Sequence, residues 1–269
     1  MTALDLDALL GAADRAARAG GEIVRANFGA PPDVREKAPG DWVTAADVAS
    51  ENAIRAVLER ETGLPVFGEE EGGERADIGW LVDPLDGTSN FVHGLEAVGV
   101  SIGLVSGGEP VVGVVHAPLL DRTYAARKGG GAFRDDRRLH VSSRTPARAI
   151  VATGFPFRRK DLLDRYEPAF GAAIHTFEDL RRVGGASLDL CWTAEGVFDG
   201  YFELALGPWD VAAGAIIVRE AGGIVTDWDG DATEWLNSGN ILAGPPQVHG
   251  VLARIASGPS ASGSRGIRR

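Results

Sequence analysis

Residues 79–90 read GWLVDPLDGTSN, an apolar run that breaks into two acids, a proline, a glycine and a threonine. The run GWLVDP is typical of a buried strand, and Asp83 and Asp86 stand three residues apart at its end. Asp, Pro and Gly are common turn residues, so one interpretation is a plain turn. The other is a cation site, because two close carboxylates repel each other unless a positive charge lies between them. On these residues alone both interpretations stay open.

The composition is typical of a soluble globular protein. The chain has 269 residues, of which 44% are hydrophobic and 24% charged. It contains no apolar run of the roughly 18 residues that a membrane helix needs, and its N-terminus lacks the basic start of a signal peptide. Cys191 is the single cysteine, which rules out an internal disulfide and favours a cytoplasmic location. The net charge of −11 argues against nucleic acid as a partner.

Hydrophobic periodicity predicts helices and strands in mixed blocks. Several strands are expected within residues 79–136, with a hairpin that turns at Gly107-Gly108, and further strands in PVFGEEEGG, AIVATGF and GYFEL. Helices are expected near residues 4–28, 45–61, 160–174, 186–196 and 246–257, and from Asp210 as N-cap through Ala221. This mixture indicates a layered α+β protein.

Acidic residues stand at the ends of apolar segments, where burial of an unpaired charge is unfavourable. Mg²⁺ prefers carboxylates, backbone carbonyls and water as ligands. Taken singly, each acid also has an ordinary interpretation as a turn residue, a solvated loop residue or a helix cap. The residues that would suit a cation site are Glu69, Asp83, Asp86 and Asp210, with the carbonyl of Leu85; Asp47 is a further acid of this kind.

Gly87 and Thr88 add a candidate anion site beside these acids. Glycine allows close backbone approach, and successive N–H groups at a turn that enters a helix can bind an anion. A cation cluster next to an anion cradle suits metal-assisted hydrolysis of a phosphate ester. The five histidines show no zinc-binding spacing. Gly99-Val100-Ser101-Ile102-Gly103 matches the nucleophile elbow of serine hydrolases, but no helical segment follows it, so Ser101 is interpreted as an ordinary strand residue.

These motifs resemble those of the inositol monophosphatase family. WLVDPLDGTSNFVHG is similar to the first signature of the family and PWDVAAGAIIVREAGGIVTDWDG to the second. VFGEEEG, DWVTAAD, ATGFPF and RRVGGASLDLCWTAEGVFDGYFEL also resemble family segments, in the family's order over residues ~5–255. Where the family has G-[ST]-A-A, this chain has Gly184-Gly185-Ala186-Ser187.

The resemblance implies a Mg²⁺-dependent, lithium-sensitive phosphatase that uses two or three ions and is usually a homodimer. It implies a layered α-β-α-β-α sandwich of the inositol monophosphatase/fructose-1,6-bisphosphatase type. We therefore predict one phosphatase domain over residues 1–257, with halves of approximately 1–145 and 146–257. A disordered, Gly/Ser-rich basic tail is expected at 258–269.

The resemblance also implies a role for each residue of the site. Glu69, with a metal, and Thr88, paired with Asp47, would hold and activate the attacking water. The metal ligands would be Glu69, Asp83, the Leu85 carbonyl, Asp86 and Asp210. The substrate would be bound by Asp86, Gly87, Thr88, Ala186, Glu203 and Asp210.

Inositol 1-phosphate, or a similar small phosphorylated polyol, is the expected substrate. Relatives of similar sequence act on fructose 1,6-bisphosphate, 3′-phosphoadenosine 5′-phosphate, histidinol phosphate or NADP, and these stay open as alternatives. A second phosphate would need a cation, which Arg158, Arg159 or Arg182 could supply. A nucleotide would need an aromatic or basic pocket for its base. A different class of function is a non-enzymatic regulatory or RNA-associated protein with the same fold.

Overall fold

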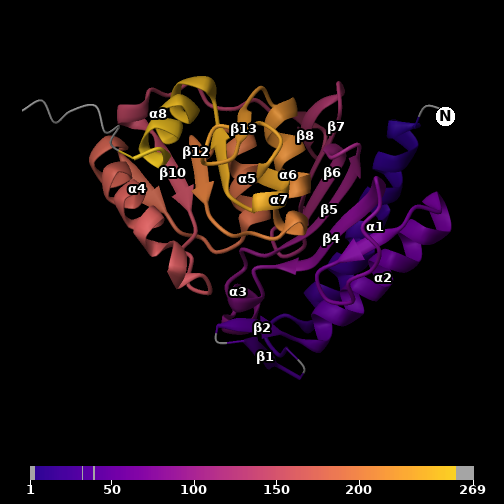
Figure 1. Cartoon of the computed structure of the whole chain (residues 1–269). Helices are drawn as coiled ribbons and strands as arrows, with labels where there is room; N and C mark the ends of the chain where they lie inside the picture. Colours follow the sequence, from indigo (N-terminus) through magenta and orange to yellow (C-terminus); the bar gives the residue numbers. More distant parts are fainter. Residues whose placement is uncertain (1–3, 32, 39, 259–269) are drawn as a thin grey trace, which may run out of the picture.

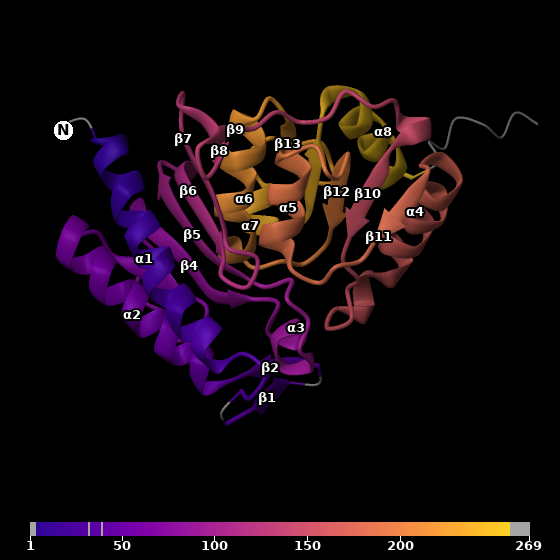
Figure 2. The ribbon, with the colours of Figure 1, turned by 180° about the vertical axis from the view of Figure 1, so that it is seen from behind.

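The computed structural model describes residues 4–31, 33–38 and 40–258, and it is built in five layers (Figure 1). Two helices cover one face of a seven-stranded sheet, two more fill the space between this sheet and a five-stranded sheet, and a last pair covers the outer face of the second sheet. Figure 2 shows the same order from behind. The first layer of helices consists of α1 (Leu6–Asn27) and α2 (Ala45–Thr62), and the middle layer of α5 (Ala186–Ala194) and α6 (Pro208–Glu220). The last layer consists of α4 (Leu163–Thr176) and α8 (Pro246–Ala256). The expected α-β-α-β-α sandwich is confirmed.

The seven-stranded sheet has the order β3-β4-β5-β6-β7-β8-β9. Only β3 and β4 pair in parallel, and the other neighbours are antiparallel. Because helices cover both faces, the central strands are buried along nearly their whole length instead of on alternate residues. The bounds are β3 (Val66–Gly68), β4 (Ile78–Asp86), β5 (Gly99–Ser106), β6 (Glu109–Ala117), β7 (Arg122–Arg127), β8 (Gly131–Arg134) and β9 (Arg137–Arg138).

The five-stranded sheet has the order β11-β10-β12-β14-β13. Strand β10 pairs in parallel with β11 and β12, while β14 pairs antiparallel with β12 and β13. The bounds are β10 (Ile150–Thr153), β11 (Asp179–Arg181), β12 (Gly200–Glu203), β13 (Ile224–Thr226) and β14 (Ile241–Gly244). Smaller elements are the hairpin β1 (Arg35–Ala38) and β2 (Asp41–Val43), α3 (Thr88–His93), α7 (Trp235–Ser238) and the 3₁₀ turns η1 (Pro146–Arg148) and η2 (Lys160–Leu162).

Close packing of α6 on the first sheet brings the two halves of the molecule together. A Cβ added at Gly103 on β5 would lie 3.0 Å from the backbone N of Ala213, and one at Gly113 on β6 would lie 2.6 Å from the carbonyl O of the same residue. Two glycines therefore let the helix lie directly against the strands. This contact places the N-terminal end of α6 beside the end of β4.

Most sequence-based boundaries agree with the structure, and one does not. The hairpin between β5 and β6 turns at Gly107-Gly108, whose φ angles of 61° and 78° are left-handed, as the sequence predicts. The prediction that Asp210 is an N-cap is wrong. Helix α6 begins at Pro208 after Gly207, because proline suits the first helical position, where its missing N–H has no partner to lose.

Two other predictions concern the ends of the chain and the membrane. The predicted basic tail at residues 258–269 lies outside the described residues except for Gly258. Among the described residues, no helix combines the length and apolar character needed to cross a lipid bilayer.

Candidate metal and phosphate site

The end of β4 is irregular, and it carries both Asp83 and Asp86. The pairing of β4 with β5 shifts between Asp83 and Asp86, so the strand bulges here. Asp83 Oδ1 accepts the N–H of Leu85 at 2.9 Å. The hydroxyl of Ser50 on α2 donates to the carbonyl of Pro84 at 3.0 Å, which ties the turn to the first helix layer. The stretch is therefore a bulge within β4, and this bulge uses only one carboxylate oxygen of Asp83.

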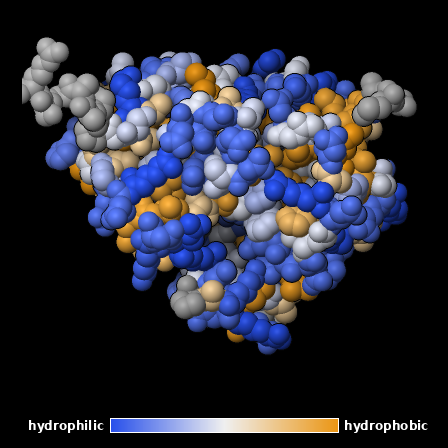
Figure 3. Space-filling view, in the orientation of Figure 1, coloured by the Kyte–Doolittle hydropathy of each residue, from blue (hydrophilic) through white to orange (hydrophobic). Residues whose placement is uncertain are grey.

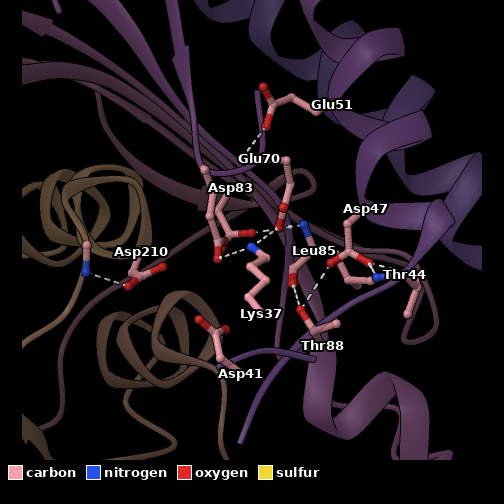
Figure 4. A network of polar contacts seen from close by, with 12 residues as sticks. Lys37, Asp41, Thr44, Asp47, Glu51, Glu70, Asp83, Leu85, Thr88 and Asp210 are labelled. Carbon is pink, nitrogen blue, oxygen red and sulfur yellow. Dashed lines mark hydrogen bonds and ion pairs between the residues drawn. The ribbon is translucent and has the colours of Figure 1, made fainter. Parts of the chain in front are cut away.

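Three carboxylates from separate parts of the chain meet beside this bulge, and Figure 4 labels two of them, Asp83 and Asp210. Glu69 follows β3, Asp83 lies in β4 and Asp210 lies in the first turn of α6; one oxygen of each lies within 4.8 Å of the others. The N–H of Glu69 donates to the carbonyl of Val82 at 3.0 Å, which continues the parallel pairing of β3 with β4. Asp210 Oδ2 accepts the N–H of Gly207 at 2.7 Å. The fold thus assembles a site of concentrated negative charge that can hold a cation.

Burial and mutual repulsion disfavour full ionisation of this cluster. Burial raises the pKa of Asp83 well above its ordinary value, and the charges of Glu69, Asp86 and Asp210 raise it further. Burial is also the largest cause of the raised pKa of Asp210. Burial raises the pKa of Glu69 to about 7, although the ammonium of Lys37 opposes this. A divalent cation between the oxygens would remove the repulsion and keep all three acids ionised.

A lysine from the β1–β2 hairpin reaches the same carboxylates. Lys37 Nζ lies 2.6 Å from Glu70 Oε1 and 3.4 Å from Glu69 Oε1. Burial lowers the pKa of Lys37, but the two glutamates outweigh this effect and its pKa is raised. Figure 4 shows the side chain of Lys37 pointing towards Glu70. The ammonium therefore partly compensates the negative charge from the solvent side.

Asp47 and Thr88 form a hydrogen-bonded pair at the edge of the cluster. Asp47 Oδ2 accepts the N–H of Thr44 at 2.8 Å and its hydroxyl at 2.6 Å, which caps α2. Asp47 Oδ1 faces Thr88 Oγ1 at 3.1 Å. The same hydroxyl lies 3.1 Å from the carbonyl of Leu85, and its single proton can serve only one of these acceptors at a time. Burial raises the pKa of Asp47, with the Thr44 hydrogen bonds acting in the opposite direction.

Gly87 separates the strand from the short helix that Thr88 opens. Its φ of 89° is left-handed, and a Cβ at this position would lie 3.0 Å from the carbonyl O of Ala97. Glycine is therefore required for the sharp change of direction between β4 and α3. This turn places the Thr88 hydroxyl beside Asp47 and exposes the first N–H groups of α3, which have no partner within the helix.

Asp86 links the cluster to the second half of the molecule. Its Oδ2 accepts the backbone N–H of Ser187 at 2.8 Å and also the hydroxyl of that residue. Burial raises the pKa of Asp86, and the hydrogen bonds from Ser187 oppose the rise. Ala186, the first residue of α5, is buried next to this contact. The carboxylate therefore lies at the N-terminal end of α5.

Glu203 lies at the end of β12, outside the cluster of three. A Cβ added at Gly154 would lie 1.9 Å from its Oε1, so the carboxylate packs directly on the backbone of the loop after β10. The hydroxyl of Tyr201 donates to it. The pKa of Glu203 is raised to about 7, chiefly by burial and also by the charge of Asp86, while the hydrogen bond from Tyr201 and the charge of Arg182 oppose the rise. Figure 3 shows the surface hollowed between the two halves on this face of the molecule.

Known proteins resemble this chain over nearly its whole length. The sequence profile of the Inositol monophosphatase family matches residues 5–258. This chain belongs to the inositol monophosphatase family. It is 40% identical over 250 residues to "Nus factor SuhB" of Pasteurella multocida, which covers 90% of this chain and 93% of the relative. It is 37% identical over 247 residues to "Fructose-1,6-bisphosphatase/inositol-1-monophosphatase" of Aquifex aeolicus, with coverage of 90% and 92%.

A solved structure of the family has the same fold. The inositol monophosphatase from Anabaena superposes with a TM-score of 0.85 at 34% identity, over 96% of this chain and 99% of that chain. Family membership makes this chain a member of a phosphatase family. The names of its relatives differ, so they do not fix one substrate.

The predicted site residues fall into two groups. Glu69, Asp83 and Asp210 meet in one cluster, with Asp86 and the Leu85 carbonyl on the same turn and Asp47 paired with Thr88 beside it. Ala186 and Glu203 lie on the elements of the second half. The roles assigned to these residues by the resemblance remain predictions, which the geometry accommodates.

Sequence reasoning missed Lys37 and Ser187. The hairpin that carries Lys37 is short and exposed, and four exposed residues in a row give no hydrophobic period to detect. Ser187 stands where the family pattern has alanine, and its contact with Asp86 joins residues 101 positions apart. By contrast, Ser101 is correctly interpreted as a strand residue: it lies in β5 and donates to the carbonyl of Trp209 at 2.9 Å.

Proposed function

We propose that the protein is a Mg²⁺-dependent phosphatase that hydrolyses inositol 1-phosphate, or a closely similar polyol monophosphate, to the free alcohol and phosphate. The observation that carries this proposal is the meeting of Glu69, Asp83 and Asp210 within 4.8 Å, beside the Thr88–Asp47 pair, in a chain of this family. Such concentrated negative charge needs a cation, and the cation in turn attracts an anionic phosphate ester.

The residues present fit magnesium. All the available donors are oxygen atoms, which Mg²⁺ prefers, and no thiolate or imidazole belongs to the cluster formed by the described residues. We propose that two or three ions are held by the carboxylates of Glu69, Asp83, Asp86 and Asp210 and by the carbonyl of Leu85. Bound there, the ions would neutralise the phosphate, lower the pKa of a water molecule and stabilise the leaving oxygen.

Thr88 and Asp47 would handle the proton of the attacking water. When the Thr88 hydroxyl donates to Asp47 Oδ1, its lone pairs are free to accept a hydrogen bond from that water. Glu69 would be the second acceptor. In a direct in-line displacement the water oxygen bonds to phosphorus, the bond from phosphorus to the alcohol oxygen breaks, and that oxygen takes up a proton. The N–H groups of Gly87 and Thr88 would hold the phosphate oxygens.

The second half of the molecule would bind the alcohol. Glu203 is half-buried at the end of β12, and a carboxylate accepts hydrogen bonds from vicinal hydroxyls. Asp86 and Asp210 have one oxygen each in a protein hydrogen bond, which leaves the other oxygen available for an ion or a hydroxyl. Ala186 would contact the ring at the start of α5. A substrate with several hydroxyls would use these acceptors best.

Two features bear on the alternative substrates. Arg158 pairs with Asp41 at 3.0 Å and Arg159 with Asp161 at 2.7 Å, while Arg182 packs 5.8 Å from the centre of the Phe157 ring. The charges of Arg182 and Arg158 lower the pKa of Glu203, which supports these two arginines as candidates to bind a second phosphate. An aromatic cavity of about 390 Å³ lies between the loop after β10 and α4, but none of the predicted site residues lines it. These two features favour fructose 1,6-bisphosphate over a nucleotide or NADP as the alternative substrate. Neither feature distinguishes histidinol phosphate from a polyol phosphate.

A second candidate function comes from the relatives named Nus factors. Their 40% identity over most of the chain favours a role as a regulatory partner of other macromolecules, alone or beside catalysis. The net charge of −11 argues that such a partner would be a protein before an RNA. We also propose that the chain forms a homodimer, which light scattering coupled to gel filtration would test.

The decisive experiment measures phosphate release from inositol 1-phosphate, fructose 1,6-bisphosphate, histidinol phosphate, 3′-phosphoadenosine 5′-phosphate and NADP. Each substrate is assayed with Mg²⁺ and with EDTA, for the wild type and for Asp83→Asn. Release that requires Mg²⁺, is fastest with inositol 1-phosphate and is lost in the variant supports the proposal. Preference for another ester changes only the substrate. A folded wild type that releases no phosphate from any of them would refute the enzymatic proposal and favour the regulatory one.

A further inference from the structure

A buried acid on α2 has no part in the chemistry proposed above. Glu51 is fully buried, and it lies one helical turn after Asp47 on the same face of the helix. Its Oε2 accepts the N–H of Glu70 at 2.8 Å, and its Oε1 accepts the N–H of Glu71 at 3.2 Å. Figure 4 shows Glu51 reaching from the helix towards Glu70. The carboxylate therefore binds the backbone directly after the predicted metal ligand Glu69.

An arginine one turn further along α2 completes this contact. Arg55 Nη2 pairs with Glu51 Oε1 at 2.7 Å and donates to the carbonyl of Gly72 at 2.8 Å. Its Nη1 donates to the carbonyl of Val66 at 2.8 Å. Val66 precedes Glu69 and Gly72 follows it, so the ion pair holds the segment on both sides of the ligand.

The backbone of this segment is shaped around the Glu51 carboxylate. A Cβ added at Gly68 would lie 2.1 Å from Glu51 Oε1, so only glycine lets the strand pass this close. The N–H of Gly68 donates to the carbonyl of Gly72 at 2.9 Å, which closes the turn. The direction of the Glu69 side chain is thus set by contacts made to α2.

We propose that Glu51 and Arg55 are a positioning pair, which holds the turn 69–71 so that the Glu69 carboxylate faces Asp83 and Asp210. A buried ion pair adds little net stability compared with apolar side chains, so geometric control is a better reason for this one. Residues that orient metal ligands through hydrogen bonds commonly change metal affinity when they are replaced. This inference rests on the proposed function, because it assumes that the cluster binds a metal.

The test compares Glu51→Gln with Asp199→Asn as a matched control. Asp199 is also fully buried, pairs with Arg144 at 2.7 Å and accepts the N–H of Ile150 at 2.7 Å. It precedes β12, at the opposite end of that strand from Glu203. Both variants remove the charge of a buried carboxylate that pairs with an arginine, but only Glu51 adjoins the cluster.

Mn²⁺ binding is measured by calorimetry, and amide hydrogen exchange is followed in metal-free protein. We expect Glu51→Gln to weaken Mn²⁺ binding by about 10- to 100-fold and to speed exchange at Glu70 and Glu71. Asp199→Asn should change the affinity for Mn²⁺ by less than about 2-fold, although it should lower the unfolding midpoint by about as much as Glu51→Gln does. If Glu51→Gln folds poorly, the double variant Glu51→Gln/Arg55→Met takes its place, because it leaves no unpaired buried charge. It should show the same loss of Mn²⁺ affinity.

Each outcome separates this inference from the proposed function. A wild type that binds Mn²⁺ and hydrolyses phosphate esters, with unchanged binding in both Glu51 variants, would overturn the positioning role alone. Equal weakening in the Asp199 variant would show a general effect of stability and would also overturn it. A wild type that neither binds Mn²⁺ nor releases phosphate would refute the proposed function, and the inference with it.

Discussion

Replacing Asp83 by asparagine should stabilise the metal-free protein while abolishing its catalysis. Asn keeps an oxygen that can accept the N–H of Leu85, so the turn at the end of β4 is preserved. What is lost is one negative charge in a cluster whose oxygens lie within 4.8 Å of one another. At an effective dielectric constant of about 20, two unit charges at that distance repel by about 3 kcal/mol.

The net gain is smaller than this, because the pKa values of the cluster are raised and part of it is protonated near neutral pH. We expect Asp83→Asn to unfold with a free energy about 1 to 3 kcal/mol higher than the wild type in EDTA at pH 8. For a chain of this size that raises the unfolding midpoint by roughly 2 to 10 °C. The difference should shrink at pH 5, where the wild-type carboxylates take up protons.

Mg²⁺ should reverse the order of stability, so that the wild type becomes more stable than Asp83→Asn. At a free Mg²⁺ concentration of 100 times the dissociation constant, the wild type gains about 2.7 kcal/mol, and the variant, with a damaged site, gains little. Urea unfolding in EDTA and in Mg²⁺ measures both quantities. Asp227→Asn is the control, since Asp227 Oδ1 also accepts the N–H two residues on, at 2.8 Å, but lies outside the cluster. A variant less stable than the wild type in EDTA at pH 8, or one that gains as much from Mg²⁺, would refute the reasoning.

Three further predictions concern single side chains. Thr88→Val should lower kcat by about 10²- to 10⁴-fold and leave the unfolding midpoint nearly unchanged, whereas Thr88→Ser keeps the hydroxyl beside Asp47 and most of the activity. Ser187→Ala removes one of two hydrogen bonds to Asp86 and should lower kcat/KM by about 3- to 10-fold, while an unchanged value would show that the backbone N–H suffices. The pKa of Glu203 is raised to about 7, so the folded state holds a proton that the unfolded state loses, and stability falls as pH rises from about 4.5 to 7. Glu203→Gln should reduce this fall in stability, as measured by urea titrations at several pH values. It should also raise KM for inositol 1-phosphate more than KM for 4-nitrophenyl phosphate.

The sequence predicts the elements best where a local pattern meets a single physical requirement. The helix stripe over residues 45–61 and the hairpin at Gly107-Gly108 are of this kind, because periodicity and left-handed turns are local properties. The sequence places the start of α6 three residues too late, since Asp210 has the chemistry of an N-cap but occupies the N3 position, where its carboxylate accepts the N–H of Gly207. In both positions an aspartate accepts a backbone N–H at the start of the helix, so composition does not distinguish them.

The site is predictable as a set of residue types and much less so as a geometry. One motif identifies Asp83 and Asp86. Their proximity to Glu69 and Asp210, however, depends on the parallel pairing of β3 with β4 and on the close packing of α6 against β5 and β6. Glu51 gave no signal, because an acid in a helix is ordinarily solvated. Only the fold shows that its side chain points at backbone N–H groups instead of water.

Each member of the cluster is fixed by hydrogen bonds made within the protein. Asp83 holds the N–H of Leu85, Asp210 holds that of Gly207, and the segment of Glu69 is held from α2. These bonds use one carboxylate oxygen of each aspartate and direct the other towards the centre. Hydrogen bonds to the backbone therefore oppose the repulsion between these carboxylates. Substitutions that loosen this backbone should weaken metal binding, as should those that remove a ligand.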